Sequence, residues 1–297
     1  TAASGTDHTG YRAAQVGVAE LLAGLPAFSD GRASLEVEQV AQVDSKDMDE
    51  STWARLALRV AHHLARQEVQ GIVITHGTDT LEETAYFLHA VLAPSKPVVL
   101  TCAMRPATAV SADGPQNLLD ALAVAAAPEA SGVLSVVAGA VHGPLDVQKV
   151  HPYRLDAFSS GDAGVLAYVE QGRLRQLRPW PAGQPRPRLL AKVSQPWPRV
   201  AIVMSHALAQ AWMVQALVQQ GVRGLVVAAT GNGTVHADLQ ATLRQAEEGG
   251  VRVLRASRCP LGRMVQSAGD DPGALAPVLL SPVKARIALA LDLMEGS

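Results

Sequence analysis

The chain is poor in cysteine, with two residues, Cys102 and Cys259, in a length of 297. Two cysteines cannot build a disulfide framework, and their wide separation fits neither a zinc-binding pattern nor a CxxC redox motif. Each lies at the end of an apolar run, in a different half of the chain. We therefore expect two small buried apolar side chains rather than a redox pair.

An excess of charge of one sign is also lacking. Lys plus Arg number 25 and Asp plus Glu number 27, which gives a formal net charge of −2. Without a basic excess we expect no nucleic-acid partner and no binding to a membrane surface. The apolar stretches are short and interrupted by Gly, Pro or charge, so no membrane-spanning helix is expected. A hydrophobic content of 48% suits a soluble protein with one large domain or two ordinary ones.

Several catalytic motifs are missing. The sequence contains no GxGxxG, no Walker A, no HExxH and no GxSxG. Dinucleotide-binding, nucleoside-triphosphate-binding, zinc-peptidase and α/β-hydrolase interpretations therefore lose their best support. The nine histidines show no metal-ligand spacing, and His76 is predicted to be structural rather than a ligand.

What is present centres on residues 71–87. Ile72 to Ile74 are β-branched, as in a strand buried on both faces, and Gly77 gives the following turn its backbone freedom. Thr80 and Glu83 have the spacing of a capping box, which predicts a helix from there onward. In a parallel sheet, ligands bind where a strand meets a helix N-terminus. Taken alone, the stretch is equally compatible with an ordinary helix cap.

The rest of the chain repeats this alternation. Further strands are predicted at 35–43, 97–102, 132–137, 200–204, 224–229 and 251–254. Further helices are predicted at 16–25, 51–67 with Ser51 as the cap, 111–126, 210–220, 234–249 and 282–294. Residues 1–15 are predicted to form a mobile loop, and residues 139–164 irregular or hairpin structure.

The alternation predicts an α/β protein with two doubly wound (Rossmann/flavodoxin-like) domains, the larger one N-terminal and the smaller one C-terminal. Proline and arginine become frequent from residue 173 to 198, where helical and strand periodicity fades. We therefore place an N-terminal α/β catalytic domain at 1–178, a linker at 179–198 and a C-terminal α/β domain at 199–297.

Polar groups follow several of the predicted strands. They are Asp44-Ser45, Thr78-Asp79, Ala103-Met104 and Gly231-Asn232-Gly233. Because the carboxyl ends of parallel strands meet at one edge of a sheet, these groups are expected to line one crevice. The chemistry available is a hydroxyl, a carboxylate and an ammonium, from Thr78, Asp79 and Lys149. A threonine hydroxyl is a weak nucleophile until a neighbour takes its proton.

Two long motifs resemble the bacterial-type L-asparaginases. Residues 74–85 read Ile-Thr-His-Gly-Thr-Asp-Thr-Leu-Glu-Glu-Thr-Ala, similar to the second signature of that family. Residues 104–106 with 111–118 are similar to the stretch that follows it. Segments 44–48, 146–149 and 231–233 match in type and order, so the resemblance spans nearly the whole chain.

The resemblance implies hydrolysis of L-asparagine to L-aspartate and ammonia, without a metal or an organic cofactor. It also implies a homotetramer, a dimer of tight dimers, in which the C-terminal domain contributes to a neighbouring subunit's site. Thr78, Asp79 and Lys149 would activate the nucleophile or the attacking water. The other residues that it implies are Ser45 for the substrate's α-carboxylate, Asp79 for its α-ammonium, Gly77 and Ala103 as backbone lining, Tyr11 in a mobile lid, and Asn232 for the neighbouring site.

Departures from the family pattern leave alternatives open. The family's primary nucleophile is a Thr in a Thr-Gly-Gly-Thr segment, which we expect upstream of Thr1. Lys46 stands where members often carry a neutral or small residue, which would alter binding of the substrate's carboxylate. Residues 266–269 include no acidic residue, at the place where strict asparaginases often supply a Glu. A dual asparaginase–glutaminase is therefore the first alternative, and a non-catalytic amino-acid-binding protein of the same fold is the second.

The compartment is open between cytoplasm and periplasm. The family's exported members often carry a cysteine pair that flanks the central motif, and neither Cys102 nor Cys259 stands there. We therefore favour the cytoplasm.

Overall fold

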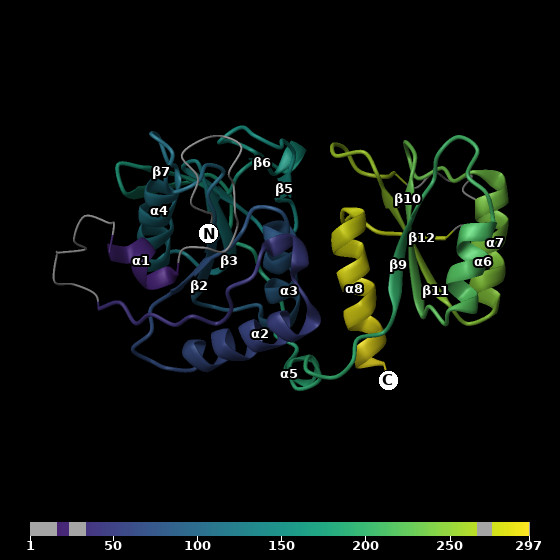
Figure 1. Cartoon of the computed structure of the whole chain (residues 1–297), viewed down its shortest axis with the longest axis horizontal. Coiled ribbons are helices and arrows are strands. Elements are labelled where there is room, and N and C mark those ends of the chain that lie inside the picture. Colours follow the sequence, from purple (N-terminus) through teal and green to yellow (C-terminus); the bar gives the residue numbers. More distant parts are fainter. Residues whose placement is uncertain (1–16, 24–33, 266–274, 297) are drawn as a thin grey trace. The chain divides into compact units, whose positions relative to one another are not determined.

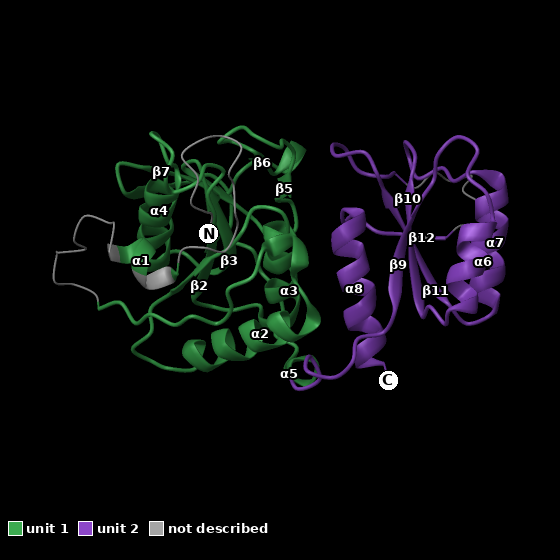
Figure 2. Ribbon diagram, viewed as in Figure 1, with its two compact units in different colours: residues 1–190 green, residues 191–297 purple. Residues whose placement is uncertain are grey.

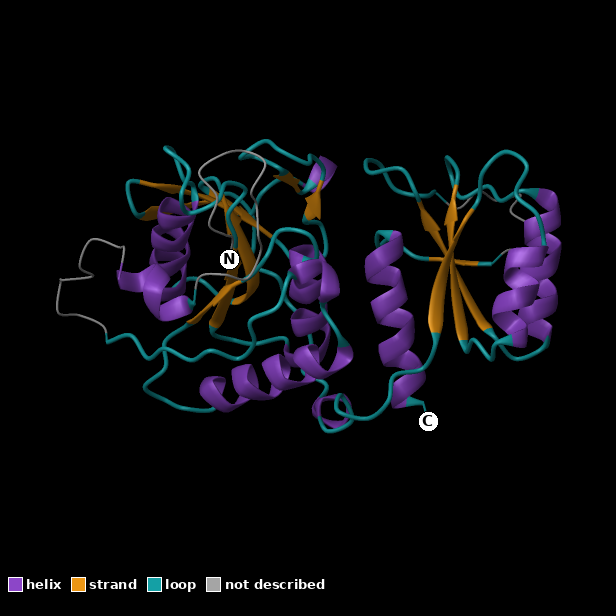
Figure 3. Ribbon diagram, in the orientation of Figure 1, coloured by secondary structure: helices purple, strands orange, loops and turns teal. Residues whose placement is uncertain are grey.

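The structure is a computed structural model that describes residues 17–23, 34–265 and 275–296. The chain divides into two compact units, residues 1–190 and residues 191–297 (Figure 2). Each unit combines a β-sheet with flanking helices (Figure 3), which confirms the predicted α/β class.

Unit 1 contains most of the helices and strands (Figure 1). Its helices are α1 (Val18–Ala23), η1 (Ser45–Asp47), α2 (Glu50–Leu64), α3 (Leu81–Leu92), α4 (Gly114–Ala126), η2 (Gly161–Ala163) and α5 (Pro187–Leu190). Its strands are β1 (Ile72–Thr75), β2 (Pro97–Thr101), β3 (Gly132–Val137), β4 (Ala140–His142), β5 (Gln148–Lys149), β6 (Phe158–Ser159), β7 (Ala167–Glu170) and β8 (Arg173–Gln176).

The main sheet of unit 1 has the order β1-β2-β3-β4-β7-β8. β1, β2 and β3 are parallel, with Ile72 opposite Val98 and Val98 opposite Val133. Every residue of β2 and β3 is buried, as expected of apolar strands covered on both faces. The carboxyl ends of these strands therefore lie together at one edge of the sheet, where a site is expected.

Helices cover the parallel strands. α4 packs against β2 and β3, where its Ala121 and Val124 join Val99 and Leu134 in one buried cluster. α3 also contacts β2 and β3, and α2 packs on α3. There the Trp53 ring stacks on that of Phe87, with the centroids 5.0 Å apart. Burial of such aromatic pairs fixes α2 and α3 relative to each other.

Unit 2 is a smaller α/β unit. Its elements are β9 (Val200–Met204), α6 (Trp212–Gln219), β10 (Gly224–Ala229), α7 (Ala237–Glu248), β11 (Arg252–Ser257), β12 (Ala276–Pro277) and α8 (Pro282–Glu295). The sheet has the order β12-β11-β10-β9 and is parallel throughout. Leu225 and Val227 of β10 point into the cluster that contains α7, whereas Val226 points into the cluster that contains α8. Successive side chains of β10 thus enter two different cores, and helices cover both faces of the sheet.

Four local predictions are wrong. Residues 35–43 form no strand, and Leu35 and Val37 are exposed. Residues 173–176, where strand periodicity was expected to fade, form β8, because their backbone pairs with β7. The cap of α2 is Asp49 rather than Ser51, since its carboxylate accepts the Thr52 N–H at 2.7 Å. Cys259 is exposed, whereas Cys102 is buried as expected.

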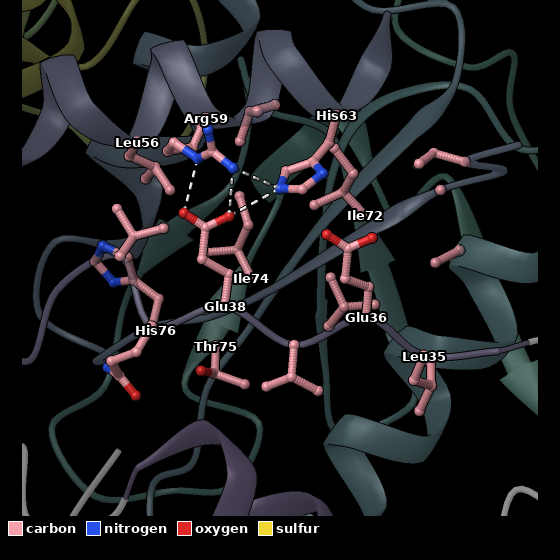
Figure 4. A pocket seen from close by; sticks show the side chains of 18 of the residues that line it. Leu35, Glu36, Glu38, Leu56, Arg59, His63, Ile72, Ile74, Thr75 and His76 are labelled. Carbon is pink, nitrogen blue, oxygen red and sulfur yellow. Dashed lines mark hydrogen bonds and ion pairs between the residues drawn. The ribbon is translucent and has the colours of Figure 1, made fainter. Parts of the chain in front are cut away.

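The segment of residues 34–43 is attached to α2 by ion pairs instead of to the sheet by backbone pairing. The Glu38 carboxylate accepts hydrogen bonds from Arg59 at 2.7 and 2.9 Å and lies 2.8 Å from the His63 ring (Figure 4). Glu36 pairs with Arg66 at 2.7 Å. These contacts hold the acidic side chains on α2, which explains why the alternating pattern of this segment does not produce a strand.

We predict that Glu38→Gln destabilises unit 1 in a pH-dependent manner. The hydrogen bonds from Arg59, and after them that from His63, lower the pKa of Glu38 from 4.5 to about 2. Because the folded-state pKa is depressed, the stabilisation is present above pH 4.5 and is lost as the pH falls toward 2. With the side chain 35% exposed, we expect a loss of at most about 1 kcal/mol at pH 7.

Urea denaturation of Glu38→Gln and wild type at pH 7 and at the lowest pH where both fold measures this difference. Glu129→Gln, an exposed carboxylate of the same unit, is the matched control and should change little at either pH. An equal loss at both pH values would contradict the assignment.

Candidate active site

The turn after β1 lies directly against η1. A Cβ built on Gly77 would lie 2.8 Å from the Ser45 Cβ and closer still to its Oγ. Two hydrogen bonds join the same segments, from the Asp79 N–H to Ser45 Oγ at 3.2 Å and from the Thr80 hydroxyl to the Ser45 carbonyl at 2.7 Å. Gly77 is therefore required because the Ser45 side chain packs directly against its backbone.

Because of this contact, Thr80 does not form the predicted capping box. Thr80 is the N-cap residue of α3, but its side chain caps no N–H of that helix. Its hydroxyl donates to Ser45 instead. The helix begins where the sequence analysis expected, whereas the threonine attaches it to η1.

Thr78, Asp79 and Lys149 lie together. The Lys149 Nζ is 2.8 Å from Thr78 Oγ1 and 2.6 Å from Asp79 Oδ1, and Thr78 Oγ1 is 3.4 Å from the same carboxylate oxygen. The Lys149 side chain is 19% exposed and that of Asp79 is 49% exposed. A hydroxyl, a carboxylate and an amine thus meet at an accessible position, the arrangement that proton transfer from a hydroxyl requires.

Lys149 reaches this position from a short hairpin. β5 pairs with β6, with Lys149 opposite Phe158. The Lys149 N–H also donates to Glu82 Oε1 at 3.2 Å. Glu82 is a residue that the sequence analysis did not single out; its place in the first turn of α3 was the available signal.

The neighbouring loop after β2 is held by Asp113 and Asn117. The Asp113 carboxylate accepts the N–H groups of Met104 and Arg105 at 2.9 and 2.8 Å. The Asn117 amide donates to the Cys102 carbonyl and accepts the Ala138 N–H, both at 2.9 Å. These contacts position the backbone beside Ala103 and join the ends of β2 and β3. The sequence feature that could have identified both residues was the motif at 111–118.

The remaining predicted site residues lie in different parts of the chain. Ser45 is buried, while the Lys46 side chain is 60% exposed and forms ion pairs with Asp44 and Asp47. Asn232 lies in unit 2, where its amide donates to the Val265 carbonyl at 2.9 Å and accepts the Val265 N–H at 2.7 Å. Tyr11 and residues 266–269 lie outside the described residues.

A cavity of about 520 Å³ lies along β1, beside residues 34–43 and α2 (Figure 4). Ser45 and Gly77 line it, whereas Thr78, Asp79 and Lys149 do not. Its walls combine apolar with polar and charged side chains, and Glu38 and Arg59 are paired with each other. Among the described residues, β1 is an edge strand that pairs with β2 alone.

No group of three His, Cys, Asp or Glu side chains suited to hold a metal ion occurs among residues 17–23, 34–265 and 275–296. Within the same ranges, no helix is long and apolar enough to cross a membrane.

Comparisons with known proteins identify the family. Residues 1–181 match the family model described as Asparaginase, N-terminal, and residues 199–297 match the Glutaminase/Asparaginase C-terminal domain. The L-asparaginase 2 of Escherichia coli K12 is 38% identical over 294 residues, which cover 96% of this chain and 83% of that protein. A glutaminase-asparaginase of Pseudomonas fluorescens biotype A is 36% identical over 273 residues, covering 91% and 75%.

A solved structure agrees. The probable cytoplasmic L-asparaginase from Campylobacter jejuni has a TM-score of 0.84 and 34% identity, covering 94% of this chain and 90% of that one. The chain therefore belongs to the asparaginase family.

We predict that Gly77→Ala displaces η1 from the turn after β1. The added methyl group would overlap Ser45, so we expect a loss of about 1–3 kcal/mol in the free energy of unfolding. Gly143→Ala is the control, because a Cβ there meets nothing nearer than 3.5 Å.

Ser45→Gly removes the overlapping atoms and should relieve most of that loss when it is combined with Gly77→Ala. Urea denaturation of wild type, the two single variants and the double variant gives the coupling free energy. Additive effects would refute the proposed overlap.

Proposed function

We propose that this asparaginase-family protein is an amidohydrolase that converts L-asparagine to L-aspartate and ammonia. The proposal rests on the contact of the Lys149 amine with both the Thr78 hydroxyl and the Asp79 carboxylate. Relatives with this activity in their names match nearly the whole chain. The proposal includes no metal ion and no organic cofactor.

In the proposed mechanism, Lys149 and Asp79 increase the reactivity of a hydroxyl or of a water molecule. The Thr78 hydroxyl can take the proton of the nucleophile, a threonine hydroxyl or a water molecule, as that oxygen attacks the amide carbon, and can pass its own proton to the Lys149 amine 2.8 Å away. Asp79 stabilises the lysine cation that results, because their charges are 2.6 Å apart. Return of that proton to the amide nitrogen of the substrate releases ammonia. If a threonine was the nucleophile, water then hydrolyses the ester that it forms with the substrate's acyl group. A threonine nucleophile or a water molecule activated by this trio remains part of the proposal.

Substrate binding is proposed for Ser45 and Asp79. Ser45 Oγ accepts the Asp79 N–H, which leaves its own hydroxyl hydrogen able to donate to the α-carboxylate. Asp79 Oδ1 contacts Lys149, and Oδ2 has no hydrogen-bond partner among the described residues, so it is able to accept the α-ammonium. Gly77 and Ala103 would line the pocket with backbone groups, and the exposed cation of Lys46 would add to the attraction for a carboxylate.

The assembly is proposed to be a homotetramer, a dimer of tight dimers. Asn232 would then reach a neighbouring subunit's site, which requires that its amide exchange Val265 for that partner. Tyr11 would act in a lid. We propose a cytoplasmic location, since neither cysteine corresponds to the pair of exported members.

A second candidate function is a dual asparaginase–glutaminase. Related proteins named glutaminase-asparaginase cover most of the chain, and residues 266–269 contain no acidic side chain. A third, binding without turnover, is disfavoured because a binder needs no trio of hydroxyl, carboxylate and amine.

We predict that Thr78→Val and Lys149→Met each lower kcat/KM for asparagine by roughly 100-fold or more, because removal of one member disables the proton transfer. Ammonia release measures this loss. Lys96→Met is the matched control: Lys96 binds the Leu64 and Arg66 carbonyls and precedes β2, at the opposite end of the strand from the trio. Undiminished turnover by Thr78→Val and Lys149→Met would refute the mechanism. Calorimetric binding of asparagine without product would establish the binding protein instead.

If the pocket accepts both asparagine and glutamine, we predict measurable glutaminase activity. One methylene group changes specificity by only about 10–200-fold in a pocket that does not reject it. The ratio of kcat/KM for asparagine to that for glutamine should then lie in or below this range. A ratio well above it would eliminate the dual function.

A further inference from the structure

We propose that His76 is a positioning residue whose imidazole, held by Thr84 and Trp53, orients the peptide bond between Gly77 and Thr78 toward the substrate. This inference rests on the proposed function and names a residue that acts through the backbone of the site. His76 is 6% exposed and follows β1 directly.

A buried series of hydrogen bonds reaches the turn from α2. The Trp53 Nε1–H donates to Thr84 Oγ1 at 2.9 Å. Thr84 Oγ1 lies 2.9 Å from His76 Nε2, and His76 Nδ1 lies 2.7 Å from the Gly77 carbonyl oxygen. Thr84 is fully buried, so water does not compete for these partners.

The two ends of the series determine where every proton lies. An indole N–H can only donate, and a carbonyl oxygen can only accept. His76 Nδ1 must therefore carry a hydrogen, and the Thr84 hydroxyl donates to the lone pair on Nε2. Burial also lowers the pKa of His76, which favours this neutral tautomer.

The orientation of the Gly77 carbonyl determines the direction of the next N–H. The described residues contain no cis peptide bond, and in a trans peptide the N–H points opposite to the C=O. With the Gly77 carbonyl held against the buried imidazole, the Thr78 N–H points away from the core. It donates to no acceptor among the described residues, whereas the next N–H, that of Asp79, donates to Ser45.

An N–H with that orientation, beside the Thr78 hydroxyl, is suited to stabilise the oxyanion that forms on the substrate's amide carbonyl. Loss of the His76 hydrogen bond should release the peptide plane. The effect should fall on the transition state, and so on kcat more than on KM.

Two amide variants separate positioning from space filling. The Asn side-chain nitrogen can take the place of Nδ1 and donate to the Gly77 carbonyl, although Asn leaves a larger void. Gln fills more of the space but places its amide near Nε2. We expect His76→Asn to keep kcat within about 5-fold of wild type and His76→Gln to lower kcat by about 100-fold. KM for asparagine should change by less than about 3-fold in both.

Thermal denaturation of the same samples records stability. If the role is only structural, His76→Gln should be both the more stable and the more active variant, and that result would overturn the proposal. His89→Asn is the control, because His89 is a buried histidine of α3 outside the hydrogen-bonded series; it should leave kcat unchanged.

A second measurement does not depend on activity. In protein labelled with ¹⁵N-histidine, long-range spectra distinguish protonated from unprotonated ring nitrogens. We expect one of the nine histidines to stay in the Nδ1–H form across the neutral pH range, and its signals to disappear in His76→Asn. If wild type releases no ammonia, the proposed function fails while this spectrum still reports the tautomer. An Nε2–H tautomer would overturn the inference directly.

Discussion

The close approach of Gly77 to Ser45 is the constraint on which the arrangement of the site depends. A Cβ at position 77 would overlap the Ser45 side chain, so glycine lets η1 approach the turn after β1 closely enough for hydrogen bonds. The Asp79 N–H then reaches Ser45 Oγ, and the Thr80 hydroxyl reaches the Ser45 carbonyl. A residue with a Cβ at position 77 would separate these segments and leave Thr78 and Asp79 without a defined orientation.

Lys149 completes the site from a distant part of the sequence. Its ion pair with Asp79 is half exposed on the carboxylate side, and such pairs contribute little to folding stability. The backbone contact with Glu82 and the β5–β6 hairpin hold the lysine in place. The value of the pair therefore lies in its chemistry, since it places an amine against a hydroxyl at a position that a substrate can reach.

The surrounding fold makes this exposed trio rigid. The buried contacts of His76, Thr84 and Trp53 connect the turn to the stacked helices α2 and α3. Asp113 and Asn117 connect the loop after β2 to α4. A polar site of this kind is supported from behind by side chains that do not themselves touch the substrate, as preorganised sites require.

The sequence by itself determined the elements whose pattern is local. Periodicity and turn chemistry predicted β1, β2, β3 and the helix that begins after Thr80. The resemblance of residues 74–85 to the family signature identified Thr78 and Asp79 as site residues. Only the tertiary structure decided which partners those residues meet. Residues 35–43 alternate like a strand, but their acidic groups form ion pairs with Arg59 and Arg66, and no strand forms there. Lys149 meets Asp79 across 70 positions, and Thr80 binds Ser45 instead of capping its own helix. Hydrogen bonds between distant segments depend on packing geometry, which no local pattern contains.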